Sequence, residues 1–319
     1  VAGNAYSSAF VTQPVATSVG VGSSLTTQPT VKVRDRFGNE RVGDAVTLSL
    51  SGGTAGAALS CTSNPVTTTS SGASFAGCKV NKSGIGFNLV ATSGAATVIS
   101  NAIDIAAVAP NGAAVSSSSS NAANYISNAS KASVTVGVTF PAGGPGETGT
   151  VTATLTQGST SVSGSASVAS TYATSATVTV DASNLADGAV AVTAKFTGGR
   201  DSSVTTGTAA TRDVVLPTDG TSVTATASGG TVVSGFINGT NTGISVTASV
   251  TSADFVSAGT AELLLGDASF TPPITSTVTA GASSVTVSKA FADAQALQAA
   301  LGAAGSKVLK VRLYDAAGN

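Results

Sequence analysis

Histidine, methionine and tryptophan are absent from the 319 residues, and charged side chains make up only 9% of them. Soluble domains usually carry about 25% charged residues. Without histidine, the chain lacks the commonest general base and the commonest transition-metal ligand of enzymes. The 14 basic and 15 acidic side chains leave a net charge of −1, whereas nucleic-acid-binding domains are strongly basic. These shortages argue against an enzyme and against a nucleic-acid partner.

Long apolar runs are also lacking. Polar residues interrupt stretches such as 98–110 well before the roughly 18–20 residues of a membrane helix, so no transmembrane segment is expected. The chain starts without the basic and apolar regions of a signal peptide, which we expect to have been removed if one existed. The apolar share is 42%, mostly Ala and Val, while Ser, Thr and Asn supply the polar residues. This composition is typical of a secreted or cell-surface β-protein.

An internal repeat divides the chain. Residues 110–115 (Pro-Asn-Gly-Ala-Ala-Val) are echoed by residues 217–223 (Pro-Thr-Asp-Gly-Thr-Ser-Val), so that the glycines at 112 and 220 lie 108 residues apart. Such a repeat indicates two copies of one fold. The residues before it form a third, differently patterned unit of similar length, as domain sizes of about 100–150 residues allow. We predict three domains, at residues 1–109, 110–216 and 217–319.

Apolar residues alternate with polar ones in short runs along the chain, as at 46–50, 134–138 and 308–313. A period of two is the pattern of half-buried strands. Turn-forming residues, such as Gly38-Asn39 and Asp187-Gly188, separate these runs. We therefore predict an all-β fold of stacked antiparallel β-sandwiches.

Residues 290–304 are the exception to this pattern. Apolar residues at 291, 294, 297 and 301 fall near helical spacing, and Gly302 or Gly305 could end a helix there. One short helix is therefore expected in the third domain.

The first domain carries a family pattern. Residues 28–39 read Gln-Pro-Thr-Val-Lys-Val-Arg-Asp-Arg-Phe-Gly-Asn, and residues 46–57 read Val-Thr-Leu-Ser-Leu-Ser-Gly-Gly-Thr-Ala-Gly-Ala. Over nearly all of residues 10–106, the sequence resembles the bacterial Ig-like (Big-type) repeats found in tandem on large secreted and cell-surface proteins and adhesins. The later domains are more weakly similar, through residues 184–188 and 314–319. The resemblance implies three tandem Ig-like sandwich modules of an adhesin, stalk, filament or surface layer, and no catalytic residues.

The two cysteines, Cys61 and Cys78, flank a predicted hairpin at 64–71. In an exported protein an isolated pair is most simply a disulfide, which would stabilise the domain by about 3 kcal/mol in the chain-entropy model. A redox or metal site is the alternative, but the pair lacks Cys-x-x-Cys spacing and the chain has no histidine to join it. We expect the disulfide.

Two segments share the pattern Asp-x-x-Gly-Asn, at Asp35–Asn39 and Asp315–Asn319. The simpler interpretation is a tight turn, in which Asp and Asn side chains bond nearby backbone groups. The alternative is a calcium ion at a domain junction, with Asp35, Asp219 and Asp315 as candidate ligands. No other cofactor is expected, and a dedicated calcium cage is disfavoured because the 15 acidic residues are scattered.

Three Asn-x-Ser/Thr segments, at Asn81, Asn128 and Asn238, fit the acceptor pattern for glycan attachment. Chance occurrence in a chain rich in Ser and Thr is the preferred interpretation.

The two ends of the chain suggest an assembly. After residue 197 the second domain adds a strand-like segment, 202–216, whereas the third stops at residue 319. Residues 2–4 repeat residues 317–319, and residues 7–10 resemble 100–103, where the last strand of the first domain begins. We predict that the third sandwich lacks its last strand and that a neighbouring copy supplies one by β-strand addition.

In this head-to-tail hypothesis two sets of residues meet between copies. The assembly strand comprises Ala5, Tyr6, Ala9, Phe10 and Val11, and the acceptor edge comprises Val308, Val311 and Leu313. Such a contact propagates as a fibre or lattice. The other interpretations are a longer tandem array, in which the strand follows in the same polypeptide, and a frayed terminus.

The expected function is that of a non-enzymatic extracellular structural protein. It would be a subunit or segment of a cell-surface fibre, sheath or surface layer, with copies of itself as partners. The alternative is the stalk of a large modular adhesin whose binding tip lies elsewhere.

Overall fold

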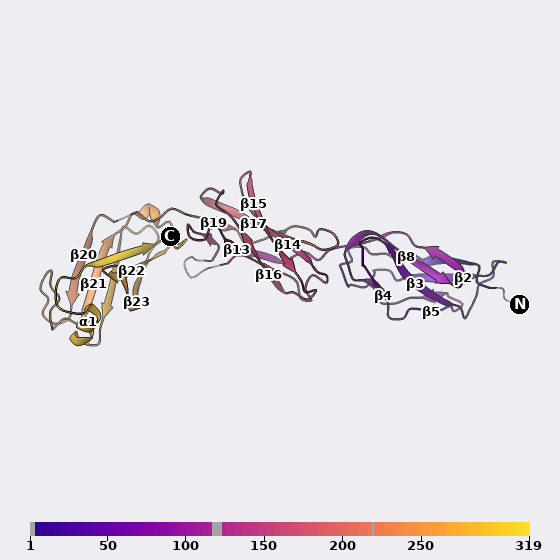
Figure 1. Ribbon diagram of the computed structural model, residues 1–319, viewed down its shortest axis with the longest axis horizontal. Helices are drawn as coiled ribbons and strands as arrows, with labels where there is room; N and C mark the ends of the chain where they lie inside the picture. Colours follow the sequence, from indigo (N-terminus) through magenta and orange to yellow (C-terminus); the bar gives the residue numbers. More distant parts are fainter. Residues whose placement is uncertain (1–3, 117–122, 219) are drawn as a thin grey trace. The chain divides into compact units, whose positions relative to one another are not determined.

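The computed structural model describes residues 4–116, 123–218 and 220–319 (Figure 1). Segments with a period of two form strands, and these strands assemble into three β-sandwiches made almost wholly of antiparallel pairs. The prediction of an all-β fold with three tandem Ig-like sandwiches and one short helix is confirmed. By contact density, the described residues group into two compact units, and the division runs through the second sandwich.

The first sandwich has two main sheets. One has the strand order β1-β2-β6 and the other the order β10-β8-β3-β5, with β9 also paired to β8 and a short β4-β7 ladder beside them. Phe87, Leu89 and Ile105 are fully buried between the sheets. The strand bounds are β1 (Ser7–Thr12), β2 (Thr30–Arg34), β3 (Ala45–Gly52), β4 (Leu59–Ser60), β5 (Val66–Thr67), β6 (Ala73–Ser74), β7 (Lys79–Val80), β8 (Gly84–Ser93), β9 (Ala96–Ile99) and β10 (Ile103–Ile105).

The second sandwich pairs a sheet of order β11-β13-β16 with one of order β12-β19-β17-β14-β15, in which β18 also pairs with β17. Alternate residues of β14 are buried, while its threonines face outward and meet serines of β15, as in the 2.8 Å contact between Thr154 and Ser163. The hydroxyls thus form the polar face of the strands. The bounds are β11 (Gly112–Val115), β12 (Tyr125–Ile126), β13 (Val134–Thr139), β14 (Gly149–Gln157), β15 (Thr160–Val168), β16 (Ser175–Val180), β17 (Gly188–Thr197), β18 (Thr205–Thr206) and β19 (Ala210–Arg212).

The third sandwich has the sheet orders β20-β21-β24 and β23-β22-β25 (Figure 1). Its bounds are β20 (Val223–Ser228), β21 (Gly243–Ser249), η1 (Ser252–Asp254), β22 (Gly259–Leu265), β23 (Ala268–Val278), β24 (Ser284–Ala290), α1 (Ala294–Leu301) and β25 (Leu309–Tyr314). The helix lies within the predicted range of 290–304.

Local chemistry explains where the helix begins and ends. The Asp293 carboxylate caps it by accepting a 2.8 Å hydrogen bond from the Ala296 amide. Leu297 and Leu301 bury its apolar face, and Gly302 ends it with a φ of 74°. Among the described residues, no helix is long and apolar enough to cross a membrane.

Candidate functional site: the open side of the third sandwich

The first two sandwiches are closed by a last strand that sits between two neighbours. In the first, β10 pairs antiparallel with β8, and the chain just after it runs parallel to residues 19–21. In the second, β19 pairs antiparallel with β17 and parallel with β12. The last strand therefore lies between a long antiparallel strand and a short parallel segment. We call the position between these two neighbours the lane.

In both sandwiches a buried serine lies before the last strand in the sequence and bonds to the long strand. The Ser100 amide donates to the Leu89 carbonyl at 2.9 Å, and the Leu89 amide donates back to Ser100 Oγ at 2.9 Å. In the second sandwich, Ser202 and Phe196 exchange the same two bonds, at 2.8 and 3.0 Å. Each serine hydroxyl also donates to the next carbonyl in the chain, at 2.8 Å. The serine thereby satisfies a buried backbone amide of the neighbouring strand, β8 or β17.

The third sandwich has no such last strand among its described residues. The strand that corresponds to β8 and β17 is β25, and it pairs with β22 alone. The corresponding inward residues of β17 are fully buried, namely Val192, Ala194 and Phe196. On β25 the inward-facing residues are only half-buried, namely Leu309, Val311 and Leu313. Val311 and Leu313 of the predicted acceptor edge thus lie on the open strand, and Val308 just before it is 61% exposed.

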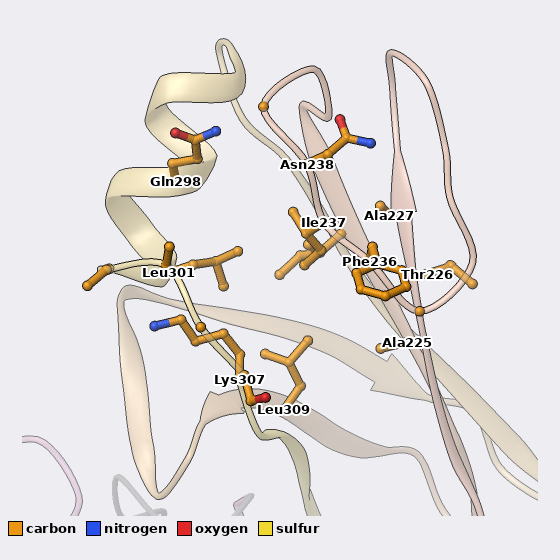
Figure 2. Close-up of a pocket in the computed structure, with 18 residues that line it drawn as sticks. Ala225, Thr226, Ala227, Phe236, Ile237, Asn238, Gln298, Leu301, Lys307 and Leu309 are labelled. Atoms are coloured by element: carbon orange, nitrogen blue, oxygen red, sulfur yellow. The ribbon is translucent and has the colours of Figure 1, made fainter.

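A cavity of about 670 Å³ lies beside β25, and we call it the slot (Figure 2). One wall is formed by β20 and by Phe236, Ile237 and Asn238, and the other by the end of α1, residues 302–307 and Leu309. Figure 2 shows Leu301 and Ile237 facing one another across it. By the sequence repeat, Phe236–Asn238 correspond to residues 125–127 of the second sandwich, which include β12. The slot therefore occupies the lane that β19 fills in the second sandwich.

The open side of the third sandwich leaves β20 more exposed than its counterpart β11. Val115 of β11 is 3% exposed, whereas Val223, its counterpart 108 residues later, is 50% exposed. Beside β11, the amide of Thr208 donates to the Ala113 carbonyl at 2.8 Å, so the segment leading to β19 covers that strand. An uncovered sheet edge beside an apolar cavity is a place where another strand can add.

The predicted assembly strand lies in its own sandwich. Residues 7–12 form β1, which pairs with β2 through five residue pairs, and the Tyr6 amide donates to the Arg34 carbonyl at 2.9 Å. Ala5 and Phe10 pack against the core of the first sandwich, whereas Ala9 and Val11 lie on its exposed face. Donation to a neighbour would have to break these pairs, so this assignment stays a prediction.

The disulfide between Cys61 and Cys78 is present, and Cys78 is fully buried in the first core. Its presence fits an oxidising compartment outside the cytosol.

The two Asp-x-x-Gly-Asn segments form the same turn. The amide and the side chain of Asn39 donate to the two carboxylate oxygens of Asp35, at 3.0 and 3.1 Å. Asn319 makes both bonds to Asp315, at 3.0 Å each. These carboxylates, 3% and 8% exposed, are engaged by the turn itself, as the simpler interpretation expects.

Two of the three calcium candidates lie within the described residues. Asp35 and Asp315 belong to different sandwiches, and Asp219 lies outside the described residues. Within the described part of the chain, no group of three or more potential metal ligands comes together.

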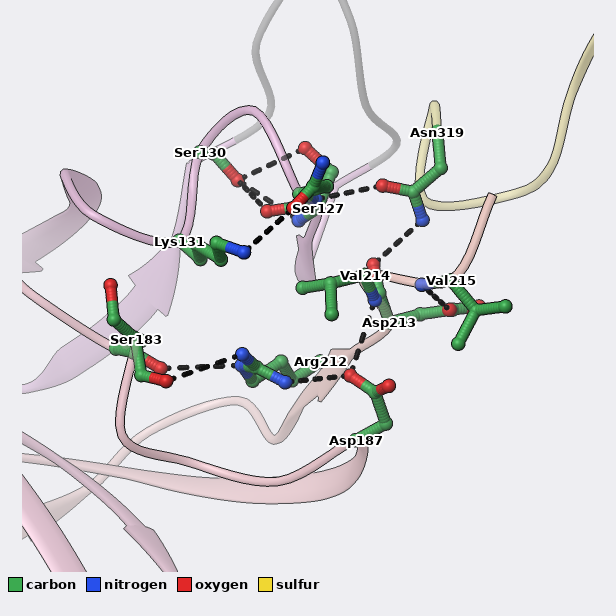
Figure 3. A network of polar contacts seen from close by, with 12 residues as sticks. Ser127, Ser130, Lys131, Ser183, Asp187, Arg212, Asp213, Val214, Val215 and Asn319 are labelled. Atoms are coloured by element: carbon green, nitrogen blue, oxygen red, sulfur yellow. Dashed lines mark hydrogen bonds and ion pairs between the residues drawn. The ribbon is translucent and has the colours of Figure 1, made fainter. Parts of the chain in front are cut away.

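Within the second compact unit, Asn319 also contacts residues next to β12 and β19 (Figure 3). Its side-chain nitrogen donates to the Asp213 carbonyl at 2.7 Å, and its side-chain oxygen accepts from the Asn128 amide at 2.7 Å. Arg212 of β19 forms a 2.7 Å ion pair with Asp187 and donates to the Ala182 carbonyl.

Burial raises the pKa of the Asp213 carboxyl above its ordinary value. A hydrogen bond from the Val215 amide opposes this rise, and the neighbouring negative charges of Asp315, Asp187 and Asp254 add to it.

Each glycan-acceptor asparagine is engaged by its surroundings. Asn81 accepts from the Ala58 amide at 2.7 Å, Asn128 from the Lys131 ammonium at 2.7 Å, and Asn238 from the Thr240 amide at 2.9 Å.

Sequence reasoning missed Glu147. This carboxylate is 3% exposed, and its Oε2 accepts from the amides of Ser83 and Gly199, at 3.2 and 3.0 Å. A lone glutamate after a glycine-rich turn gives no signal of such a role, because its partners lie 64 and 52 residues away. The two closing serines lie between strands, Ser100 directly after β9 and Ser202 between β17 and β18. In a chain rich in serine, this position alone does not distinguish them.

The fold defines the class of the protein as a tandem of Ig-like β-sandwiches. No protein-family model and no curated protein matches the chain. Among solved structures, it is similar to the FN1–FN3 domains of chicken CNTN1, with 11% identity over 94% of this chain and 98% of that one and a TM-score of 0.37. A likeness at this level establishes neither a family nor a function.

Proposed function

We propose that this chain is a non-enzymatic extracellular structural protein built from bacterial Ig-like repeats. It serves as a subunit or segment of a cell-surface fibre, sheath or surface layer. In this proposal copies join head to tail, and a strand from a neighbouring copy closes the third sandwich. The observation that carries the proposal is the open lane beside β25, which its sister sandwiches fill with β10 and β19.

Two further features support this proposal. The buried disulfide stabilises a sandwich outside the reducing cytosol. The scarcity of charge, at 9% of residues, suits close packing between subunits more than electrostatic capture of a ligand.

Negative-stain electron microscopy of the purified chain, with the intact mass of the native polypeptide, tests the proposal. Fibres or sheets formed by the purified 319-residue chain are expected. Deleting residues 1–11 would also remove β1, an edge strand of the first sandwich. A disulfide that holds β1 in place, called the lock below, is therefore the more specific test. Ala9 and Lys32 are directly paired between β1 and β2, and changing both to cysteine ties β1 to its own sandwich.

The lock distinguishes β1 from any other segment as the strand that is donated to the neighbouring copy. If β1 is the donated strand, the locked protein stays monomeric while the Ala9→Ser, Lys32→Ser control assembles. Fibres from both would show that another segment is the donor, and monodisperse monomers of the unmodified chain would reject head-to-tail assembly.

The turn at Asp315–Asn319 favours the second candidate, a stalk segment of a large modular adhesin. In the first sandwich the same turn reverses the chain, so that Glu40 pairs back with Arg34. In a polypeptide that continues past Asn319, this geometry would lay the following residues along the open edge of β25. Single beaded rods from a much larger native polypeptide are the outcome expected of a stalk.

A further inference from the structure

We propose that the slot is a selective acceptor for one kind of peptide, an extended segment of a second molecule that begins with a serine and carries apolar residues at alternate positions. This inference rests on the proposed function, because it specifies the strand that closes the third sandwich.

The two sister sandwiches define the direction of the bound segment. Both β10 and β19 run antiparallel to the long strand and parallel to the short segment on the other side. In the slot these neighbours are β25 and residues 236–238. The bound segment therefore runs antiparallel to β25, with its leading residues opposite the end of β25 and its later residues beside Leu309.

The leading serine follows from the backbone of the long strand. Ser100 and Ser202 each supply the acceptor for an amide of that strand and bond to its carbonyl. Both are almost fully buried, at 6% and 8% exposure. In a strand added to β25, a serine at the same place would make these bonds with an inward-facing residue of β25, either Val311 or Leu313.

The apolar positions follow from the first sandwich. Three and five residues after Ser100, Ile103 and Ile105 point into the core and are 5% and 0% exposed. Apolar residues also line the slot, including Ile237, Leu301 and Leu309. Burial of two such side chains is the main source of affinity.

Charge sets a further preference. Among the described residues that line the slot, Lys307 is the one charged side chain. The segment in the first sandwich carries one acid, Asp104, between its two isoleucines. A neutral or singly acidic segment therefore suits the slot better than a basic one.

Fluorescence anisotropy with the full 319-residue chain tests this proposal. The probe is a labelled peptide with the sequence of residues 98–107, Val-Ile-Ser-Asn-Ala-Ile-Asp-Ile-Ala-Ala. Saturable binding is expected. A peptide with Ser100→Ala should bind about tenfold more weakly, because a buried amide of β25 loses its acceptor. A peptide with Ile103→Asp and Ile105→Asp should not bind.

Two variants of β20 locate the binding. Ala225 lines the slot and Thr224 on the same strand does not, and both side chains are exposed. Ala225→Glu should reduce binding at least tenfold, and Thr224→Glu should leave it unchanged. Equal affinity for both variants would place the peptide elsewhere, for example in the first sandwich in place of β10, and would overturn the proposal. Absence of saturable binding, or equal binding of a scrambled peptide, would also overturn it.

The peptide-binding and microscopy experiments test two separate claims, the acceptor site and the head-to-tail assembly. If the peptide binds at the slot but the chain forms no fibres, the acceptor stands and head-to-tail assembly is rejected. If fibres form and an excess of peptide neither binds nor dissolves them, assembly stands and this acceptor is rejected.

Discussion

At the scale of single residues, the least conspicuous side chains hold the sandwiches closed. Ser100 and Ser202 lie in a chain rich in serine, yet each satisfies a buried amide, of Leu89 in β8 and of Phe196 in β17. Glu147 does the same for two amides far away in the sequence. A buried amide without an acceptor costs more than an ordinary hydrogen bond contributes, so these positions tolerate substitution poorly.

Ser202→Ala should lower the free energy of unfolding by about 1–3 kcal/mol, because the Phe196 amide would be left without its acceptor. Urea unfolding followed by circular dichroism measures this loss. Ser203→Ala is the matched control, since the side chain of Ser203 is exposed and its carbonyl is retained. Equal stability of the two variants would show that the Ser202 hydroxyl is dispensable.

The direction of the Asp213 pKa shift predicts the sign of a pH dependence of stability. The pKa of Asp213 in the folded chain is raised above the ordinary 3.8, chiefly by burial. Below pH 3.8 the carboxyl is protonated in both states, and as the pH rises through the folded-state pKa its ionisation destabilises the folded state. Asp213→Asn should therefore raise the melting temperature at pH 7 and leave it nearly unchanged at pH 3.

Thermal melts at several pH values measure this difference. The amide oxygen can still accept from Val215, which Asp213 engages at 3.2 Å, so the turn is preserved. A variant that is less stable than the original at neutral pH would show that the carboxylate is stabilising.

At the scale of elements, closure depends on which strands have two neighbours. β8 and β17 are flanked on both sides and bury their inward side chains, whereas β25 is flanked on one side. The disulfide supports the first sandwich where strands are shortest, because Cys61 and Cys78 follow and precede the two-residue strands β4 and β7. Short ladders contribute little by themselves, so a covalent link has a large effect there.

Replacing both cysteines with serine should destabilise the first sandwich by about 3 kcal/mol in the chain-entropy model, for the 17-residue separation. Calorimetry should show one transition moving to lower temperature while transitions from the later sandwiches stay in place. A uniform shift of all transitions would indicate that the sandwiches unfold as one cooperative unit.

At the scale of the whole molecule, three sandwiches of one architecture differ in one respect that bears on assembly. Among the described residues, two are closed by strands of their own, and the third has the slot beside β25, which in the proposed assembly accepts a strand of a neighbouring copy. An acceptor that differs from its donor makes a heterologous contact, which propagates rather than closing into a dimer. The near-zero net charge of −1 adds little long-range repulsion between copies.

Much of the architecture was predictable because it depends on local pattern. Alternation of apolar and polar residues predicts strands such as β14, and helical spacing with a following glycine predicts α1. The cysteine pair predicts its disulfide, since no other partner exists in the sequence.

Tertiary structure alone decided how the ends and polar groups are used. It placed residues 7–12 against β2, which the sequence likeness to residues 100–103 did not indicate. It also engaged both Asp-x-x-Gly-Asn carboxylates within their own turns. Strand pairing and burial depend on contacts between residues far apart in the chain, summed over a whole sheet, whereas sequence pattern reports only the preferences of neighbours. Thus the sequence by itself determined the strands, the repeat and the disulfide, and only the packed sandwiches determined that β1 pairs with β2 and which serines satisfy buried amides.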